Sequence, residues 1–419
     1  MTPVRTTTSH TLPGGHVASV STRPNGRVAT IHANGLAINH GVRGGRVIVS
    51  EHNGRTIVSE GHHGGYVQRP YLNRGGRSYY QRTYYRNGHA YSRAYRGYEY
   101  HGGHYYGYVP DHYYHPRYYG WAYHPWSRPV YYSPAAWGWA GSPWYGAYGG
   151  FFTPYPVYAT ASLWLTDYLI ASNLQAAYQA GVQAGAAGAG GQPPAAGNQA
   201  PDSGNPEAST QQTPLSPEVK QAIADEVQRQ IAAEQAAAAN PQGGNPQGDN
   251  PQAANPQGDT TQATNTPPAP GPDQVPDALN PAERVFVVSS SIDVTPAGGQ
   301  ECGLTAGDVL MRLSDTPDDN QNVTASVQSS KAGDCAAGQT VAVSVQDLQE
   351  MHNHFREQID SGLKTLADNS GKNGLPSAPD TGTQPGEVPA PAPDAGAADQ
   401  LQAQEQQADQ VETQVQQSN

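Results

Sequence analysis

Cys302 and Cys335 are the residues of this chain whose chemistry is most readily specified. They lie 33 positions apart, one at a predicted Gly-Asp turn and the other just before a predicted closing strand. In an oxidising compartment we expect them to form a disulfide, which for a loop of this length contributes roughly 3–4 kcal/mol to stability. In the cytosol they would be two unpaired thiols, and the sequence leaves both states open.

Other reactive side chains do not combine into a catalytic site. Asp380-Thr381-Gly382 repeats the triplet of aspartic proteases, but Pro- and Gly-rich sequence replaces the buried apolar strands that such chemistry needs. Asp315, Asp318 and Asp319 form a cluster that lacks the Gly and the terminal Glu of a calcium loop. We find neither a nucleophile elbow nor a P-loop. We therefore predict a non-enzymatic protein without a cofactor.

Histidines are concentrated in the first third of the chain, where thirteen of the fifteen precede residue 130. Imidazoles at this density could take up Zn, Ni or Cu adventitiously, but no pair of cysteines or acids completes a site. His352 and His354 lie two positions apart on a predicted helix and therefore point in different directions. The sequence predicts no physiological metal site.

Charge divides the chain into a basic and an acidic part. Residues 1–130 contain fifteen Arg, no Lys and four acids, although the whole chain carries a net charge of -12. Arg interleaved with Tyr and Gly is typical of proteins that bind RNA through phosphate contacts and base stacking. The same residues hold Tyr-rich assemblies together, or bind anionic envelope glycans, through cation–π contacts. Because the basic part lacks Lys and the remainder is acidic, we favour an envelope protein whose basic part binds anionic surface material or self-assembles, with RNA binding as the alternative.

The first 96 residues predict an antiparallel β meander. Alternating apolar positions are separated by tight-turn residues, of which Asn34-Gly35 is the strongest hairpin signal. A nine-residue direct repeat follows, in which 45–51 is echoed by 54–60. In the resulting hairpin we expect Arg46 to lie near Glu60 across the two strands.

Tyr and Trp dominate the next part of the chain. Twenty-four of the twenty-six Tyr lie between 66 and 158. Because Gly and Pro are too frequent after 96 for regular strands, we predict an irregular, extended region there. Residues 161–178 then predict a helix whose dense apolar part is shorter than the roughly twenty residues that span a bilayer and contains Asp167. We therefore expect a buried or docking helix and no transmembrane span.

A second helix begins at Ser216-Pro217-Glu218, where the N-cap, the first-turn proline and the acid occupy their preferred positions. Its apolar residues recur every four positions from Val219 to Ile231 in one narrow stripe, which predicts pairing with another helix. Asn-Pro-Gln then recurs every five residues between 240 and 259. Proline at that spacing predicts a semi-extended spacer.

The segment 284–345 is the one that predicts a compact module. Glu283–Ser290 predicts a strand, Glu301–Leu313 a turn that leads into a second strand, Val323–Ser330 a short helix and Gly338–Val345 a closing strand. Glycine supplies the turn conformation, and the Asp can accept hydrogen bonds from backbone N–H groups ahead of the apolar strand.

This order of elements, together with Thr316-Pro317 at the end of the second strand, resembles the PDZ-like modules of bacterial envelope proteases and secretion proteins. The resemblance covers about 65 residues of the 419 and implies a structural turn built from Gly303, Leu304, Gly307 and Asp308. Such domains bind a peptide carboxylate with a Gly-rich loop, but here 279–283 contains an acid and no glycine. We therefore assign no peptide-binding residue, and strand addition along Val285–Ser290 is the remaining binding mode.

A helix over Gln346–Asn369 follows the module and is predicted to pack on it or on a protein partner. No apolar signal-peptide core follows Met1. The disulfide-capable cysteines and the long linkers nevertheless favour export to the periplasm, the cell envelope or the outside, from a start upstream of this one; a cytoplasmic location is the alternative.

The predicted fold class is mixed and largely of low complexity. It combines an N-terminal antiparallel meander, isolated helices, a small α+β PDZ-like module and long disordered linkers and tail. The predicted segments are 1–96 (Arg/Gly-rich hairpins), 97–158 (irregular Tyr/Trp region), 159–182 (helix), 183–214 (linker), 215–239 (amphipathic helix), 240–280 (Asn-Pro-Gln linker), 281–346 (PDZ-like module), 347–369 (helix) and 370–419 (disordered tail).

Overall fold

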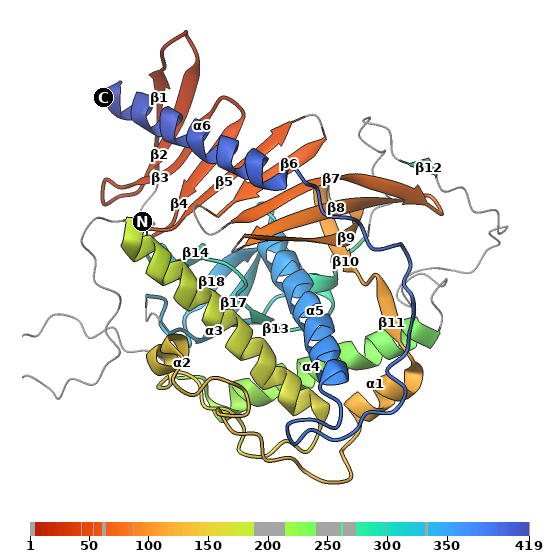
Figure 1. Ribbon diagram of the computed structural model, residues 1–419. Coiled ribbons are helices and arrows are strands. Elements are labelled where there is room, and N and C mark those ends of the chain that lie inside the picture. The colour runs from red at the N-terminus through yellow and green to blue at the C-terminus, as the bar shows by residue number, and fades with distance from the viewer. Residues whose placement is uncertain are drawn as a thin grey trace, which may run out of the picture.

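The computed structural model describes residues 5–42, 44–52, 54–60, 64–86, 88–187, 214–239, 261–262, 274–297, 299–331 and 334–418. The predicted linker over 183–214 and the Asn-Pro-Gln spacer lie mostly outside these residues. The described part forms one body in which a large sheet, a smaller sheet and several helices pack together (Figure 1).

The large sheet confirms the predicted meander. Its strands follow one another in sequence order and are antiparallel: β1 (Thr6–Thr11), β2 (Val17–Thr22), β3 (Val28–Ala33), β4 (Leu36–His40), β5 (Arg46–His52), β6 (Arg55–Ser59), β7 (Gly65–Arg74), β8 (Arg77–Arg86), β9 (His89–Tyr100) and β10 (Gly103–Val109), with the short β12 (Thr261–Gln262) paired to β7. Asn34 and Gly35 have φ values of 53° and 76°. This is the left-handed pair that a two-residue hairpin turn requires.

The nine-residue repeat forms the β5–β6 hairpin, as predicted. The expected ion pair across it is wrong. Arg46 contacts Asp409 and Glu412 near the end of the chain, and Glu60 pairs with Arg86 on β8. Local spacing identified the hairpin, but the ion pairs are made with segments that the repeat does not contain.

The irregular region predicted for 97–158 is also wrong in its first part. β9 continues to Tyr100, β10 follows, and β11 (His112–Tyr114) leads into α1 (Pro116–Tyr123). The strand continues through Gly97, because the ring of Tyr80 on β8 fills the space that a side chain would take. A Cβ at position 97 would lie only 2.4 Å from Cε2 of Tyr80. The glycine thus allows an aromatic ring to pack on the sheet.

The two faces of the large sheet are covered by different parts of the C-terminal third. Alternate residues of β8 show this division. Gln81 and Thr83 hydrogen-bond to the backbone of Ala392 and Asp394, whereas Arg82 binds Glu350 on α5 (Val345–Asp368). The period-two geometry of a strand therefore directs one set of side chains to α5 and the other to the chain after 383.

The predicted disordered tail is wrong. β19 (Thr383–Pro385) pairs with β11, and α6 (Ala397–Gln417) lies across β5–β8 (Figure 1). Leu401, Ala408, Val411 and Val415 line its buried face, and the last three pack on Leu12 and the apolar residues of β2–β5. A helix this polar gains its stability from docking on the sheet rather than from intrinsic propensity.

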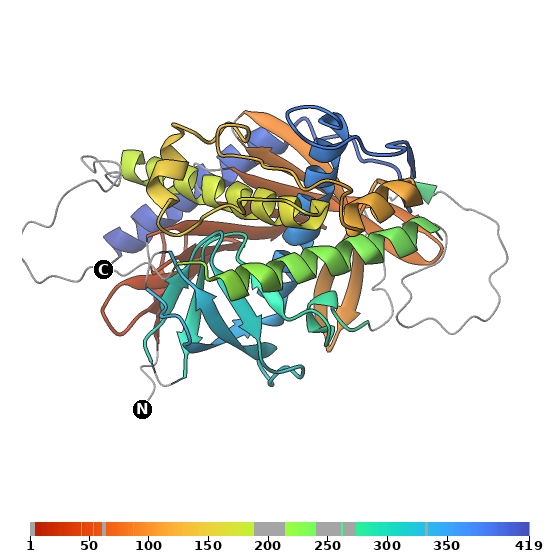
Figure 2. The same cartoon turned by 90° about the horizontal axis from the view of Figure 1, so that it is seen from below.

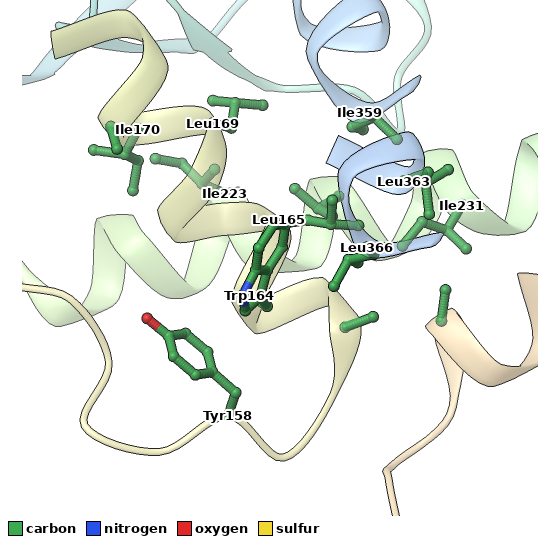
Figure 3. Packing of buried hydrophobic residues seen from close by; sticks show 14 of the residues in the cluster. Tyr158, Trp164, Leu165, Leu169, Ile170, Ile223, Ile231, Ile359, Leu363 and Leu366 are labelled. Carbon is green, nitrogen blue, oxygen red and sulfur yellow. The ribbon is translucent and has the colours of Figure 1, made fainter. Parts of the chain in front are cut away.

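The helices are not isolated. α3 (Ala161–Ala187) and α4 (Pro217–Ala239) lie side by side below the sheet and contact α5 (Figure 2). Tyr158, Trp164 and Leu165 pack there with apolar residues of α4 and α5 (Figure 3). Most of the remaining aromatic residues of 113–158, with the short α2 (Pro143–Tyr148), extend this core. None of the helices that the structure describes is both long and apolar enough to cross a membrane.

The C-terminal α+β region confirms the coarse prediction for this part of the chain. Its sheet has the order β13 (Val285–Val287), β16 (Val309–Arg312), β17 (Asn322–Ser329), β18 (Thr340–Ser344), β14 (Ile292–Pro296) and β15 (Cys302–Leu304), preceded by the 3-10 turn η2 (Asp277–Leu279). The helix expected over Val323–Ser330 is wrong: this segment is β17, whose alternating buried and half-exposed residues pair with β16 and β18. The trailing helix is α5, within one residue of its predicted bounds.

Candidate interaction sites

Asp308 organises the Gly-Asp turn of the small sheet. Its carboxylate accepts hydrogen bonds from the backbone N–H of Thr305 at 2.8 Å and from the backbone N–H and the Nζ of Lys331, both at 2.9 Å. Both charged groups are buried and form an ion pair. The turn predicted from Gly303, Leu304, Gly307 and Asp308 therefore has a structural role, in which a buried carboxylate joins two loops.

Gly307 is the position in this turn where a side chain is excluded. Its φ is +92°, and a Cβ there would lie 3.2 Å from Cδ2 of Leu174 on α3. We expect Gly307→Ala to destabilise the protein by about 1–3 kcal/mol, because the backbone conformation and the close helix both oppose the methyl group. Urea unfolding followed by fluorescence would measure this.

A matched control is Gly338→Ala, where φ is +79° but nothing lies within 4 Å of the added Cβ. It carries the backbone strain without the contact. Equal losses for the two variants would mean that packing of α3 against the turn contributes nothing.

Cys302 and Cys335 form a disulfide in the structure, with their Cα atoms 5.3 Å apart. Both residues are buried in the core of the small sheet, and Cys302 lies on the edge strand β15. Beside them, the backbone N–H of Gly303 donates to the carboxylate of Asp334 at 2.6 Å. The disulfide therefore links β15 to the loop before β18. The carboxylate of Asp334 accepts the hydrogen bond of the Gly303 N–H, so this edge N–H is not free to pair with another strand.

Strand addition at the opposite edge meets an obstacle. All three residues of β13 are buried, and the strand contacts α4 and α5. Val285 and Val287 belong to the helical core, and Phe286 to the core of the small sheet. A peptide that paired with β13 would have to displace helices, so Val285–Ser290 is not an accessible docking edge in this conformation.

Several arginines of the N-terminal part form ion pairs with acids of the C-terminal part. Arg23 contacts Asp293 at 2.6 Å and Glu301 at 2.9 Å, which joins the β2–β3 end of the large sheet to the small sheet. Arg82 forms a two-pronged contact with Glu350 at 2.5 and 2.8 Å. These pairs neutralise part of the charge asymmetry seen in the sequence.

Arg82 also occupies an aromatic cage. It is buried, and its guanidinium lies 4.1 Å from the ring centre of Tyr95 and 4.7 Å from that of Tyr66. Tyr95 in turn donates to Glu357 on α5. The cation–π contacts expected for the Arg/Tyr-rich part are thus present, but they connect the sheet to its own helix.

A pair of carboxyl groups lies where α4 faces α5. Glu234 is buried, and its carboxylate lies near Asp360, which accepts a hydrogen bond from Tyr108 at 2.5 Å. Burial, and then the charge of Asp360, raise the pKa of Glu234 well above its usual value, although Arg356 opposes the shift. Burial likewise raises the pKa of Asp360. The pair favours at least one protonated carboxyl group.

We expect Glu234→Gln to change the pH dependence of stability. A carboxyl group whose pKa is higher in the folded than in the unfolded chain stabilises the fold in acid, and that contribution is lost as pH rises from about 4.5 through the raised pKa. The amide removes this loss. The variant should match the parent near pH 4 and be more stable by about 1–3 kcal/mol near pH 7, as measured by urea unfolding across pH. The exposed Asp319→Asn is the control; a Glu234→Gln protein that is no more stable than the parent at neutral pH would contradict the assignment.

The remaining residues singled out by sequence have local roles. Asp315 pairs with Arg284 and Arg312, and Asp318 accepts from backbone N–H groups of its own loop. His352 contacts Glu283, whose charge raises the pKa of the imidazole although burial opposes it. Among the described residues, no group of three His, Cys, Asp or Glu is placed to hold a metal ion.

Asp380 lies in an exposed turn with a φ of 40° and faces His115. The buried strands that an aspartic protease would need around such a triplet are not found among the residues described near it.

The two edges of the large sheet differ in how their backbone groups are used. At β10, the side-chain amide of Asn353 accepts from the N–H of Tyr108 at 2.9 Å and donates to the carbonyl of Tyr106 at 2.7 Å, and Arg356 donates to the carbonyl of Tyr108. At β1, five of the six residues are exposed. No hydrogen bond to the outer backbone groups of β1 is found within the described part of the chain.

Sequence reasoning found the Gly-Asp turn and the cysteines but not the groups that join the two halves. Arg82 and Glu350 are 268 positions apart, and nothing local indicates their pairing. The lone Asp167 in an apolar helix was the one available signal, since a buried acid requires a cationic or hydrogen-bonding partner. Comparison with known proteins gives no match: no family model, curated protein or solved structure is similar to this chain.

Proposed function

We propose that this protein is a non-enzymatic, exported protein of the cell envelope or surface that acts by assembly and protein contact. The observation that carries the proposal is the binding of N-terminal arginines by C-terminal acids, exemplified by Arg23, Arg46 and Arg82. Cations engaged in this way are poor sites for a polyanion, because binding would first have to break their ion pairs. This favours assembly over capture of RNA or of an anionic polymer.

The disulfide supports the extracytoplasmic part of the proposal. Bonds of this kind form and persist in oxidising compartments and are rare in the cytosol. The PDZ-like resemblance of the small sheet remains part of the proposal as a surface for a protein partner. With β13 covered by helices, such a partner would contact loops and helices instead of adding a strand.

Export is tested by the state of the cysteines in cells that express the full coding sequence. We expect both thiols to resist alkylation until a reductant is added, and the protein to fractionate with periplasm, envelope or medium. Free thiols on a cytosolic protein would contradict the proposal.

RNA binding is tested separately on the purified chain. We expect no salt-sensitive shift of single-stranded RNA at physiological ionic strength. A shift that weakens steeply with added salt would support the RNA-binding alternative.

A further inference from the structure

The register of β1 determines which of its backbone groups face outward. The N–H of Leu12 donates to the carbonyl of His16 at 2.7 Å, and Thr11 is paired with Val17 at the same end of the hairpin. Because hydrogen-bonded pairs alternate along an antiparallel ladder, the even residues of β1 bond to β2. The N–H and C=O groups of Thr7, Ser9 and Thr11 therefore point away from the sheet.

The bonds on the far side of β2 agree with this register. Arg23 donates its N–H to the carbonyl of Arg27 at 2.8 Å. Counting back in steps of two from Arg23 assigns the odd residues of β2 to β3 and leaves its even residues for β1. The free edge thus consists of three alternate residues, Thr7, Ser9 and Thr11, whose six backbone N–H and C=O groups face outward.

The side chains of β1 leave that edge open. Thr7 hydrogen-bonds to Ser21 at 3.0 Å and Thr8 to His10 at 2.9 Å, so that these hydroxyl groups are engaged over the faces of the sheet and not across its edge. The strand Thr6–Thr11 contains no Pro, no Lys and no acid. These are the residues with which proteins normally protect an exposed edge from pairing.

We infer that β1 pairs with β1 of a second copy of this chain, antiparallel and about a twofold axis at Ser9. Ser9 then faces Ser9 of the second copy, and Thr7 faces Thr11, so that all six outward groups of each strand are paired. The inference rests on the assembly part of the proposed function and not on its export part.

Chemistry favours an identical strand over another occupant. Thr–Thr and Thr–Ser neighbours across a ladder are favourable, and an uncharged strand meets no like charge at the twofold axis. Edges that select a foreign peptide add side-chain pockets to the backbone bonds, whereas β1 is exposed on both faces. A self-complementary edge gives a closed, isologous dimer.

The test compares sedimentation velocity of the parent chain with that of Ser9→Pro, over concentrations from micromolar to millimolar. Proline removes an outward N–H and leaves the bonds to β2 intact. We expect a concentration-dependent dimer in the parent, at least tenfold weaker dimerisation in Ser9→Pro and no change in Ser9→Ala, which retains the N–H. A parent that stays monomeric, or Ser9→Pro that dimerises as well as Ser9→Ala, would overturn the inference.

Cross-linking gives a second readout that does not depend on tolerating proline. Because both native cysteines are in the disulfide, Ser9→Cys adds one thiol, which across a twofold axis would lie about 5.5 Å, Cα to Cα, from its copy. A short bismaleimide should join two chains. Tyr131→Cys, at an exposed site away from β1, should not be joined. Equal cross-linking of both variants would also overturn the inference. Failure of either test leaves the export assay unaffected, so the two proposals fail separately.

Discussion

Lys220→Met is expected to destabilise the protein by about 3–5 kcal/mol, because it leaves a buried carboxylate without its counter-ion. Lys220 Nζ lies 2.6 Å from the carboxylate of Asp167, and both side chains are buried between α3 and α4. Asp167 also accepts from the hydroxyl of Tyr158 at 2.7 Å and the N–H of Tyr155 at 2.6 Å. Removing the ammonium group therefore leaves two hydrogen bonds to support a charge in the aromatic core. Urea unfolding followed by tryptophan fluorescence would report the loss, since Trp164 lies in the same core.

Two comparisons separate this effect from a general cost of removing Lys. Lys364→Met breaks an exposed pair with Asp368 on α5 and should cost no more than about 0.5 kcal/mol. Adding Asp167→Asn to Lys220→Met should restore part of the stability, because the uncompensated charge is gone. Burial already raises the pKa of Asp167 despite Lys220. The defect of Lys220→Met should therefore diminish in acid as this carboxyl becomes protonated, and a defect that is independent of pH would argue against the mechanism.

Val411→Lys is expected to detach α6 from the large sheet, at a cost of about 2–4 kcal/mol. Val411 is buried in the cluster formed by α6, Leu12 and the apolar residues of β2–β5. An ammonium group there has to remain unpaired in an apolar layer or carry the helix into water. We expect faster hydrogen exchange in α6 and β1–β5, together with increased binding of an apolar dye to the uncovered face.

Gln410→Lys is the matched control, since Gln410 is adjacent in sequence but exposed. It should change the free energy of unfolding by less than about 0.5 kcal/mol. If both variants behaved like the parent, α6 would not be a structural part of the sheet, and the original prediction of a disordered tail would regain its support.

Local chemistry explains which elements could be predicted. Asn34-Gly35 specifies a turn through its own backbone preferences. The capping sequence at Ser216–Glu218 fixed the start of α4 to within a residue. The Gly-Asp turn was recognised for the same reason, because Asp308 binds the N–H of Thr305 only three positions away.

The errors share a different origin. Gly97 suggests a break in the strand when only its neighbours in sequence are considered. Its role is to leave space for the ring of Tyr80, which lies seventeen positions earlier. The sequence of α6 predicts a disordered tail because its apolar stripe is narrow. This stripe stabilises the helix only by packing on the sheet that the beginning of the chain forms. The segment 323–330 forms a strand because β16 and β18 flank it. In each case tertiary contacts outweighed local composition.

The order in which the parts of the chain are synthesised has a consequence for how the protein folds. The meander is complete by residue 109, yet α5, the helix that binds Arg82, begins at Val345, and the helix that binds Arg46 begins at Ala397. Both faces of the sheet therefore stay uncovered until the last quarter of the chain has been synthesised. Contacts this distant in sequence make folding slow and leave apolar strands uncovered in the nascent chain. We therefore expect folding to be completed only after the C-terminal helices have been synthesised, and a chain released early to be prone to aggregation.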